Sequence, residues 1–440
     1  MMNRASAVRA GHAIRKEWLV EKVCVGYGRD EIIELEIEAK NLVGVYEPNI
    51  VPKIDCHRCL ADALAQPLGR PSFDEFVAGD EKIVVIVNDG TRPTPTRHLL
   101  EEIYPRIADK DLLFVIATGI HRESTQEEYE FIFGKDLYPI LRERGQIHDH
   151  DARKDPMTYL GKSSNGTEMY INSLVAEAKK VLVIGGVEPH YFAGYAGGRK
   201  SFLPGVAGYD TISQNHILAL SDKAQALALE GNPVHEDMLD AMKCLAHLDI
   251  FSIQTVLDRD HDVYALFAGD LEKTFFAAID KAAEVFCVDI PEKADIVISA
   301  APYPMDVDLY QSQKALDNGK LALKEGGILI MVGKCRTGIG EEAFYDLLAS
   351  QPTPQGVLDK IKKEFKLGWH KAAMMAEINL WAESWAVTDL TDEQMRAVHF
   401  KPYHDLRLAL ADALAKKGPD ARVIVLPSGS ITAPRLARQG

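Results

Sequence analysis

Apolar residues along the chain fall into short runs separated by stretches with helical periodicity. Runs rich in β-branched residues at 82–88, 111–118 and 179–186 predict buried strands. Helices are expected to begin at about Thr94 after the first strand and at about Thr125 after the second. Such alternation of strands and helices is typical of an α/β unit with a parallel sheet.

The second half of the chain repeats this rhythm after a helical segment near residues 269–285. Its predicted elements are a strand at 294–300, a helix at 308–324, a strand at 326–333 and a last strand within 421–429. The pattern therefore predicts an α/β protein of two domains with mostly parallel sheets and an active-site cleft between them. We place the N-terminal domain at residues 1–275 and a Rossmann-like C-terminal domain at residues 276–440.

Residues 21–47 depart from the rhythm, because their apolar positions alternate with polar ones. Two strands are predicted there, in VCVGYG and in IELEIEAKNLVGVYE. The N-terminal domain is therefore expected to begin with a small β-rich segment.

The composition is that of an ordinary soluble globular protein. Of 440 residues, 47% are hydrophobic and 26% charged, and charge breaks each apolar run before it reaches membrane-spanning length. The 65 acidic and 50 basic residues give a net charge of −15, which argues against a nucleic-acid partner held by a general basic field. The basic residues within 1–18 precede no continuous apolar segment, so we expect no secretory signal, no membrane partner and a cytoplasmic location.

The cysteines are scattered and form no disulfide framework. Cys56 and Cys59 make a CxxC motif, but no second pair follows to complete a zinc site, and the context is not that of a thioredoxin. Aspartate-flanked histidines at 148–151 and 260–262 lack a third metal ligand and are interpreted as solvated turns. The six thiols are interpreted as reduced, at Cys24, Cys56, Cys59, Cys244, Cys287 and Cys335.

Ligands of open α/β sheets bind at the carboxyl ends of strands, and three predicted strands carry unusual clusters there. After the first, residues 88–95 read NDGTRPTP and place Arg92 in a turn shaped by proline and glycine. The donors around this cation favour anion binding, although a loop with Thr91 or Thr94 as helix cap and a solvated arginine has the same composition. After the second, His121 is either a structural hydrogen-bonding group or an acid-base catalyst.

The third cluster, residues 188–208, is the most informative. Five glycines within 194–208 surround Lys200, which lets the backbone approach a ligand closely, and neighbouring aromatic residues can flank a flat ring. The run GRKS is similar to part of a Walker A loop, but Arg199 replaces the glycine required before the lysine, which excludes a nucleotide triphosphatase. An aromatic pocket would keep the lysine amine neutral and available for covalent chemistry.

Further candidates lie later in the sequence. His216 follows Asn215 at the predicted start of a helix, where it can either ligate a late first-row metal or cap the helix. Tyr310, Gln311 and Lys314 share one face of a predicted helix, either as a solvated first turn or as polar donors that close the cleft.

Together these motifs resemble the nickel-dependent lactate racemase family. The resemblance rests on DGTRPTP, ATGIHRE, PHYFAGYAGGRKSFLPGVAG with the downstream NH, and LYQSQK, so it covers both predicted domains. It implies a racemase or epimerase of a 2-hydroxy acid that works by reversible hydride transfer through a 2-oxo acid. The implied cofactor is a nickel-pincer nucleotide, pyridinium-3-thioamide-5-thiocarboxylate mononucleotide with nickel, which requires cofactor maturation enzymes as partners.

The resemblance also implies a role for each candidate residue. Lys200 would carry the cofactor through a thioamide, and His216 would ligate the nickel. His121 and His190 would exchange protons with the substrate. Contacts to cofactor and substrate would come from Asp89, Arg92, Tyr310, Gln311 and Lys314, with Trp369 as a further aromatic wall.

Two other functions are compatible with the sequence. A nicotinamide-dependent 2-hydroxy acid dehydrogenase would suit the α/β sheets, but no GxGxxG motif follows an early strand with an acidic residue about twenty positions on. A non-catalytic binding protein for a phosphorylated metabolite would account for the glycine-rich anion loops, but it leaves His121 and His190 without a role.

Overall fold

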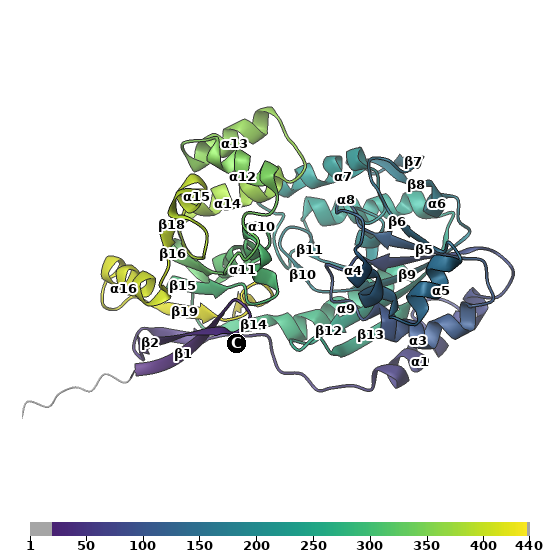
Figure 1. Cartoon of the computed structure of the whole chain (residues 1–440), viewed down its shortest axis with the longest axis horizontal. Helices are drawn as coiled ribbons and strands as arrows, with labels where there is room; N and C mark the ends of the chain where they lie inside the picture. Colours follow the sequence, from purple (N-terminus) through teal and green to yellow (C-terminus); the bar gives the residue numbers. More distant parts are fainter. Residues whose placement is uncertain (1–19, 438–440) are drawn as a thin grey trace, which may run out of the picture.

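The chain builds two six-stranded sheets, and the two lobes around them stand side by side in Figure 1. The computed structural model describes residues 20–437, so the expectation for residues 1–18 lies outside the described part. The α/β class with mostly parallel sheets, predicted from the sequence, is confirmed. Within residues 20–437, no helix is long and apolar enough to cross a membrane.

The first lobe has the strand order β13-β12-β9-β4-β5-β6, in which β12 and β13 are antiparallel and the other pairs parallel. Runs of Val, Ile and Leu form these strands because both faces of the sheet are covered, and the first five residues of β4 are all buried. The bounds are β4 (Ile83–Asn88), β5 (Leu112–Ala117), β6 (Ile147–Asp149), β9 (Lys180–Gly186), β12 (Asp249–Leu257) and β13 (Val263–Gly269).

Different helices cover the two faces of this sheet, because side chains alternate between the faces along each strand. Val85 shares a core with the first five helices, α1 (Cys56–Ala65), α2 (Phe73–Phe76), α3 (Thr96–Ile107), α4 (Gln126–Phe133) and α5 (Leu137–Glu143). Val84 shares the opposite core with α6 (Ser173–Ala176), α7 (Tyr209–His216) and α8 (Pro233–Ala241). The helix predicted from about Thr125 is confirmed, since Thr125 caps α4.

The second lobe has the strand order β18-β17-β16-β15-β19-β3, and every pair is parallel. Its strands are β15 (Ala294–Ala300), β16 (Leu323–Val332), β17 (Glu383–Val387), β18 (Lys401–Tyr403), β19 (Val423–Leu426) and β3 (Leu42–Val45). Its helices are α10 (Leu309–Ser312), α11 (Lys314–Ala322), α12 (Glu342–Ala349), α13 (Pro354–Lys363), α14 (Trp369–Trp381), α15 (Asp392–Ala397) and α16 (Leu406–Lys417). α9 (Leu271–Phe286) precedes this lobe and packs on β12 and β13 of the first.

The first strands of the chain belong to the second sheet. The predicted division counted them with residues 1–275, and the second of two predicted strands is in fact two, β2 (Glu31–Glu38) and β3. β1 (Val20–Tyr27) and β2 form an antiparallel hairpin whose apolar face, including Val25 and Ile37, packs on the second sheet, while β3 pairs with β19. A two-stranded hairpin cannot bury its apolar face by itself, so this face packs against the neighbouring sheet.

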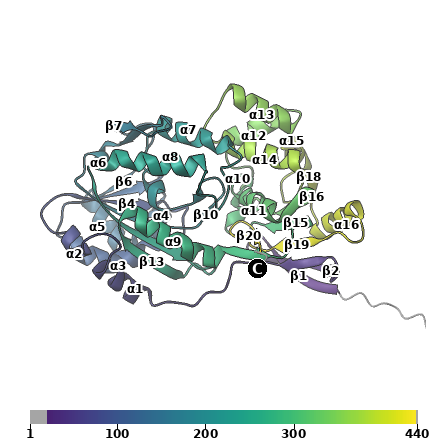
Figure 2. The same ribbon diagram turned by 180° about the vertical axis from the view of Figure 1, so that it is seen from behind.

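The three sequence clusters meet at one point of the first sheet. β4 lies between β5 and β9, so the order of the strands along the chain reverses there, and the clusters follow the carboxyl ends of these three strands. Such a reversal opens a crevice at the carboxyl edge of a parallel sheet. The short strand β10 (Pro189–His190) and helix α10 lie where the two lobes meet in both Figure 1 and Figure 2.

The remaining elements are short. They are β7 (Met157–Lys162), β8 (Glu168–Asn172), β11 (Gly194–Tyr195), β14 (Cys287–Ile290), β20 (Ala433–Leu436) and the 3₁₀ turns η1 (Gly198–Ser201), η2 (Ile217–Leu220), η3 (Met242–Leu245) and η4 (Met305–Val307). Of these, β10, β11 and η1 carry the glycine-rich cluster, and η2 contacts α14 of the second lobe. The site described below is built from these loops and short turns.

Candidate active site

A carboxylate at the end of β4 holds the histidine at the end of β5. Asp89 Oδ2 lies 2.6 Å from Nδ1 of His121, and Asp89 Oδ1 accepts a hydrogen bond of 2.7 Å from the hydroxyl of Thr91. Burial raises the pKa of Asp89, but the hydrogen bond and charge of His121 and the charge of Arg92 outweigh it, so the pKa of this carboxyl is lowered overall. The His121 side chain is 44% exposed, which leaves its Nε2 edge accessible.

The loop after β4 does not cap the helix as expected. α3 begins at Thr96 with Pro95 as its N-cap residue and no side-chain cap bond. Thr94 instead accepts a hydrogen bond of 2.7 Å from the side-chain amide of Asn88, and Thr91 is engaged with Asp89, so neither hydroxyl is free for capping.

Arg92 stands on the same loop as Asp89 and pairs with the loop that follows β9. Its Nη1 is 3.3 Å from Oε1 of Glu188, which follows β9, and both side chains are about 30% exposed. The charge of Arg92 lowers the pKa of His190 and also helps to lower that of Asp89. The arginine is therefore electrostatically close to His190 and to the carboxylate that holds His121, and it can bind an anion there.

His190 has a different environment from His121. Its ring is buried, stacked on Tyr191 at 4.7 Å between centroids and edge-on to Phe192 at 4.6 Å. Its Nδ1 accepts a hydrogen bond of 3.3 Å from the backbone N–H of Ala193, and its Nε2 lies 3.3 Å from Nζ of Lys200. Burial, followed by the charges of Lys200 and Arg92, lowers the pKa of His190 well below its ordinary value, so this imidazole is neutral near pH 7.

Lys200 sits in a turn that only glycines permit. Gly197 and Gly198 adopt φ of +85° and +53°, and a Cβ on Gly198 would lie 2.8 Å from Phe275. The amine of Lys200 points over the ring of Phe192, 5.4 Å from its centroid. Burial, with the charge of Arg92 second, lowers the pKa of Lys200 well below its ordinary value, as the sequence predicted for a neutral, nucleophilic amine.

His216 ends a helix rather than beginning one. α7 starts after Gly208 and finishes at His216, so the predicted start at Asn215 is wrong. The His216 ring is buried edge-on to Phe192, and its Nδ1 makes no hydrogen bond of good geometry among residues 20–437, although the backbone of Ile212 lies near the ring and acts to raise its pKa. Burial lowers the pKa of His216 well below its ordinary value, which keeps the ring neutral and able to ligate a metal.

A buried carboxylate behind α7 holds this histidine in place. Asp237 of α8 is 1% exposed and accepts a hydrogen bond of 2.8 Å from the side-chain amide of Asn215. It also accepts bonds from the hydroxyls of Thr167 and Ser163. Because Asn215 directly precedes His216, this network fixes the last turn of α7.

The second lobe adds buried cations. The predicted helix at 308–324 is two short helices, α10 and α11, joined at Gln313, with Tyr310 and Gln311 on the first and Lys314 at the start of the second. Burial, with the charge of Arg92 second, lowers the pKa of Lys314 to about 8. The charge of Lys314, like that of Arg92, lowers the pKa of His190, so the three residues lie in one electrostatic cluster.

Two family models match the chain. The lactate racemase N-terminal domain matches residues 27–228, and the lactate racemase C-terminal domain matches residues 290–432. The chain belongs to the lactate racemase family. The family assignment made from the sequence motifs is therefore confirmed.

Known lactate racemases are similar to this chain in sequence and in structure over most of its length. The lactate racemase of Thermoanaerobacterium thermosaccharolyticum is 35% identical over 380 residues, which is 83% of this chain and 88% of that protein. The lactate racemase of Lactiplantibacillus plantarum is 34% identical over 391 residues, 86% of this chain and 90% of that protein. The structure of the lactate racemase apoprotein from Thermoanaerobacterium thermosaccharolyticum is similar with a TM-score of 0.86 at 31% identity, covering 94% of this chain and all of the other.

Sequence reasoning missed two residues of this family member's cleft. His370 Nε2 lies 3.3 Å from the hydroxyl of Tyr191, and its ring is 5.6 Å from that of His216. Lys371 donates a hydrogen bond of 2.6 Å to the backbone oxygen of Tyr310 and lies 3.5 Å from the centroid of that ring. Trp369 was singled out instead, but its ring belongs to the core of the second lobe, beneath Lys360 and Lys366.

The histidines interpreted as solvated turns form no metal cluster. His148 Nε2 lies 2.8 Å from Asp155, and the buried ring of His150 lies 3.0 Å from the amide of Asn172 and 2.9 Å from the backbone oxygen of Ala207. Among residues 20–437, no group of three or more histidine, cysteine or carboxylate side chains is arranged to hold a metal ion. His148 and His150 are thus structural groups of the first lobe.

Proposed function

We propose that this chain is a racemase of lactate or of a closely related 2-hydroxy acid, acting through a nickel-pincer nucleotide attached to Lys200. Activity on lactate is taken from the names of the two relatives. The observation that carries the proposal is the juxtaposition of a neutral lysine amine with the buried imidazole of His190, 3.3 Å apart, in a glycine-lined turn at the crevice of the first sheet.

The residues present fit the proposed cofactor. The Lys200 amine is desolvated, so it is available for a covalent bond. His216 offers a neutral ring whose Nδ1 makes no hydrogen bond of good geometry among the described residues. Lys200 would hold the organic part and His216 would supply the protein's ligand to nickel.

Bound there, such a cofactor would supply an acceptor for the hydrogen that leaves Cα with its electron pair. That chemistry suits imidazoles, because removing the Cα proton next to a carboxylate is a poor task for a base with an ordinary pKa of about 6.5. The histidines need to move only the hydroxyl proton of the substrate. The product of this step is a planar 2-oxo acid, which can be reduced on either face.

The two histidines enter this reaction as different tautomers. In neutral His121, Nδ1–H donates to Asp89, so Nε2 carries a lone pair and can take a proton. In neutral His190, Nδ1 accepts from Ala193 N–H, so Nε2 carries the hydrogen and can donate a hydrogen bond. His121 can thus take the hydroxyl proton of the substrate, while His190 can donate a hydrogen bond to the substrate oxygen and must gain a proton before it acts as an acid.

The cations of the cleft would bind the anionic groups. Arg92 and Lys314 lie close enough to lower the pKa of His190, so a carboxylate held by them would sit beside the reacting carbon. Both cations are only partly exposed to solvent, which strengthens a charge-assisted bond relative to one in water.

The test uses protein produced together with the maturation enzymes. We expect one nickel per chain, a mass increase on the peptide that contains Lys200, and interconversion of D- and L-lactate. Lactate deuterated at Cα should give the other enantiomer with deuterium retained, because a hydride does not exchange with water whereas a proton on imidazole does. Deuterium loss in step with inversion would overturn hydride transfer, and net reduction of added NAD would favour a dehydrogenase.

A further inference from the structure

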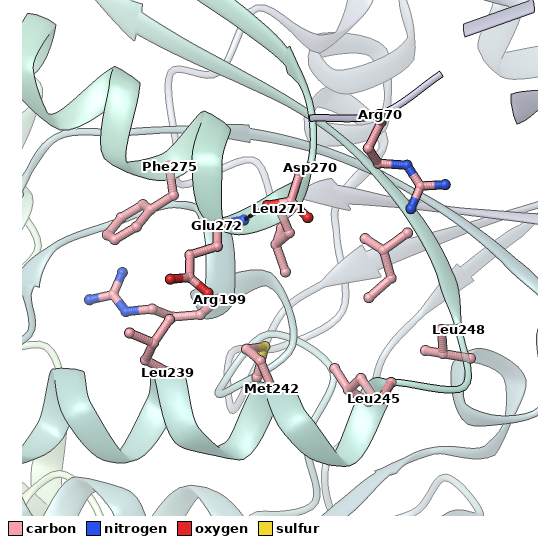
Figure 3. A pocket seen from close by; sticks show the side chains of 12 residues that line it. Arg70, Arg199, Leu239, Met242, Leu245, Leu248, Asp270, Leu271, Glu272 and Phe275 are labelled. Carbon is pink, nitrogen blue, oxygen red and sulfur yellow. Dashed lines mark hydrogen bonds between the residues drawn. The ribbon is translucent and has the colours of Figure 1, made fainter. Parts of the chain in front are cut away.

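Arg199 is a buried cation that directly precedes Lys200 in the turn η1. It is 2% exposed, and in Figure 3 its guanidinium lies beside the ring of Phe275 from α9, with 4.2 Å between the guanidinium carbon and the ring centroid. Burial lowers the pKa of Arg199 only to about 9, so the side chain stays charged near pH 7. No carboxylate of residues 20–437 forms an ion pair with it, and a buried cation in this state costs free energy. Nothing in the proposed reaction uses this charge.

The donors of Arg199 are directed at the backbone of the loop that carries the site. Its Nη2 donates hydrogen bonds of 2.8 and 3.2 Å to the carbonyl oxygens of Ala193 and Tyr195, and its Nη1 lies 3.5 Å from the carbonyl oxygen of Gly197. The first two residues belong to the hairpin of β10 and β11, which carries His190, and Gly197 directly precedes η1. One side chain therefore ties this hairpin to the turn that follows it.

The geometry of η1 makes this anchoring set the direction of Lys200. A 3₁₀ helix has three residues per turn, so the side chains of neighbouring residues point about 120° apart. Arg199 points towards α9, while Lys200 points over Phe192, and its Nζ lies 3.3 Å from Nε2 of His190. Rotation of η1 would break the bonds of Arg199, so holding that side chain keeps the amine of Lys200 beside His190.

We propose that Arg199 is a positioning residue, whose guanidinium holds the hairpin and η1 together so that the amine of Lys200 stays beside His190. The inference rests on the proposed function, in which Lys200 carries the cofactor. A lysine in place of Arg199 would keep the charge, but it has one nitrogen where the guanidinium uses two, and it has no flat face to lie on Phe275. The shape of the guanidinium, rather than its charge, is thus the property that the turn requires.

The test compares Arg199→Met and Arg199→Lys, produced with the maturation enzymes and collected before attachment is complete. Intact-protein mass gives the fraction of folded chains that carry the adduct, and peptide mass locates it at Lys200. We expect this fraction to fall by about tenfold or more in both variants, because a displacement of about 1 Å can slow a reaction by about 10²-fold. Arg153→Met is the matched control and should keep the normal fraction, since Arg153 also stacks on a ring, that of Tyr209, but is exposed.

A residue that only supports the fold would lower the melting temperature without changing the adduct fraction of the folded chains. A normal fraction in folded Arg199→Met would therefore overturn the positioning role. A normal fraction in Arg199→Lys with a loss in Arg199→Met would overturn it as well, because charge alone would then suffice. If neither protein folds, Phe275→Leu removes only the ring beside the guanidinium. We expect a severalfold fall there, and a normal fraction would overturn the role.

Failure of the proposed function would look different from failure of the positioning role. The unsubstituted protein would then carry no adduct at Lys200, and the positioning role would fall with the attachment itself. An adduct that is present in the unsubstituted protein and normal in Arg199→Met would overturn the positioning role alone.

Discussion

The two walls of the cleft are built in different ways. The first-lobe wall consists of strand-end loops whose side chains are fixed by directed hydrogen bonds, such as Asp89 to His121 and Ala193 to His190. The second-lobe wall consists of short helices that bring two lysines, the partly buried Lys314 and the buried Lys371, with no hydrogen bond to the histidines of the first wall. Under the proposed function this difference would separate two tasks: the first wall would orient proton transfer, and the second would supply charge for binding.

The largest effect is expected from removing Lys200, the residue on the first wall to which the cofactor would be attached. Lys200→Ala should leave the fold intact, because the glycines shape the turn, but it should abolish the covalent adduct and all racemisation above background. Intact-protein mass and nickel content are the measurements, with exposed Lys223→Ala as the matched control. An adduct that persists on another residue would contradict the assignment.

The next largest effect is expected from substituting the two histidines of the first wall. His121→Gln and His190→Gln should each lower kcat/KM by about 10² to 10⁴, the usual contribution of a general acid or base. Since the equilibrium constant between enantiomers is one, each variant must lose the same factor in both directions. Initial rates from pure D- and pure L-lactate check this, and near-normal turnover by either variant would remove that residue from the mechanism.

The sequence predicted the first wall better than the second for a physical reason. The first wall follows three buried strands, so its residues stand in continuous motifs at positions that a parallel sheet brings to one edge. His370 and Lys371 stand in the first turn of a helix that is buried on most sides, next to Trp369, which the sequence interpretation selected instead. The run GWHK was the sequence feature that could have pointed to these residues. Only the tertiary packing shows that its histidine and lysine face the site.

Local interactions also explain why two helix starts were predicted at the wrong residues. Thr94 was expected to cap a helix, yet its hydroxyl satisfies Asn88 at the end of β4. His216 was expected to start a helix, yet the chain is already helical from Tyr209, because Gly208 ends the preceding loop. In the case of β1 and β2, the strands were predicted correctly but their partner sheet is more than 250 residues away in sequence, which no local pattern encodes.

The orienting role of the first wall is tested by Asp89→Asn. The amide keeps the shape but no longer favours the tautomer of His121 with its lone pair on Nε2, so kcat should fall by about tenfold to a hundredfold, less than on deleting the imidazole. KM should change little, because Asp89 binds His121 and not the substrate. Thr91→Val, which removes only the hydroxyl bond to Asp89, should have a smaller effect on the same two constants.

The charge-supplying role of the second wall is tested by Lys314→Met. Burial, followed by the charge of Arg92, lowers the pKa of Lys314 only to about 8, so this amine stays mostly protonated near pH 7. We expect KM for lactate to rise by about tenfold with kcat nearly unchanged, as for a group that contributes one charge-assisted contact to binding. A fall in kcat at constant KM would show that the walls do not divide the tasks as proposed.

The smallest expected effect lies behind the first wall, at Asp237. Its three partners, Asn215, Thr167 and Ser163, all donate to it. Asp237→Asn would therefore set an amide N–H₂ against a donor and leave a buried group unsatisfied, at a cost of about 1 to 3 kcal/mol in the free energy of unfolding. Urea denaturation measures that cost, and nickel content of the folded protein measures whether the last turn of α7 still presents His216. If stability falls while nickel content and turnover stay normal, the network supports the fold only, and the orientation of His216 must come from its contact with Phe192.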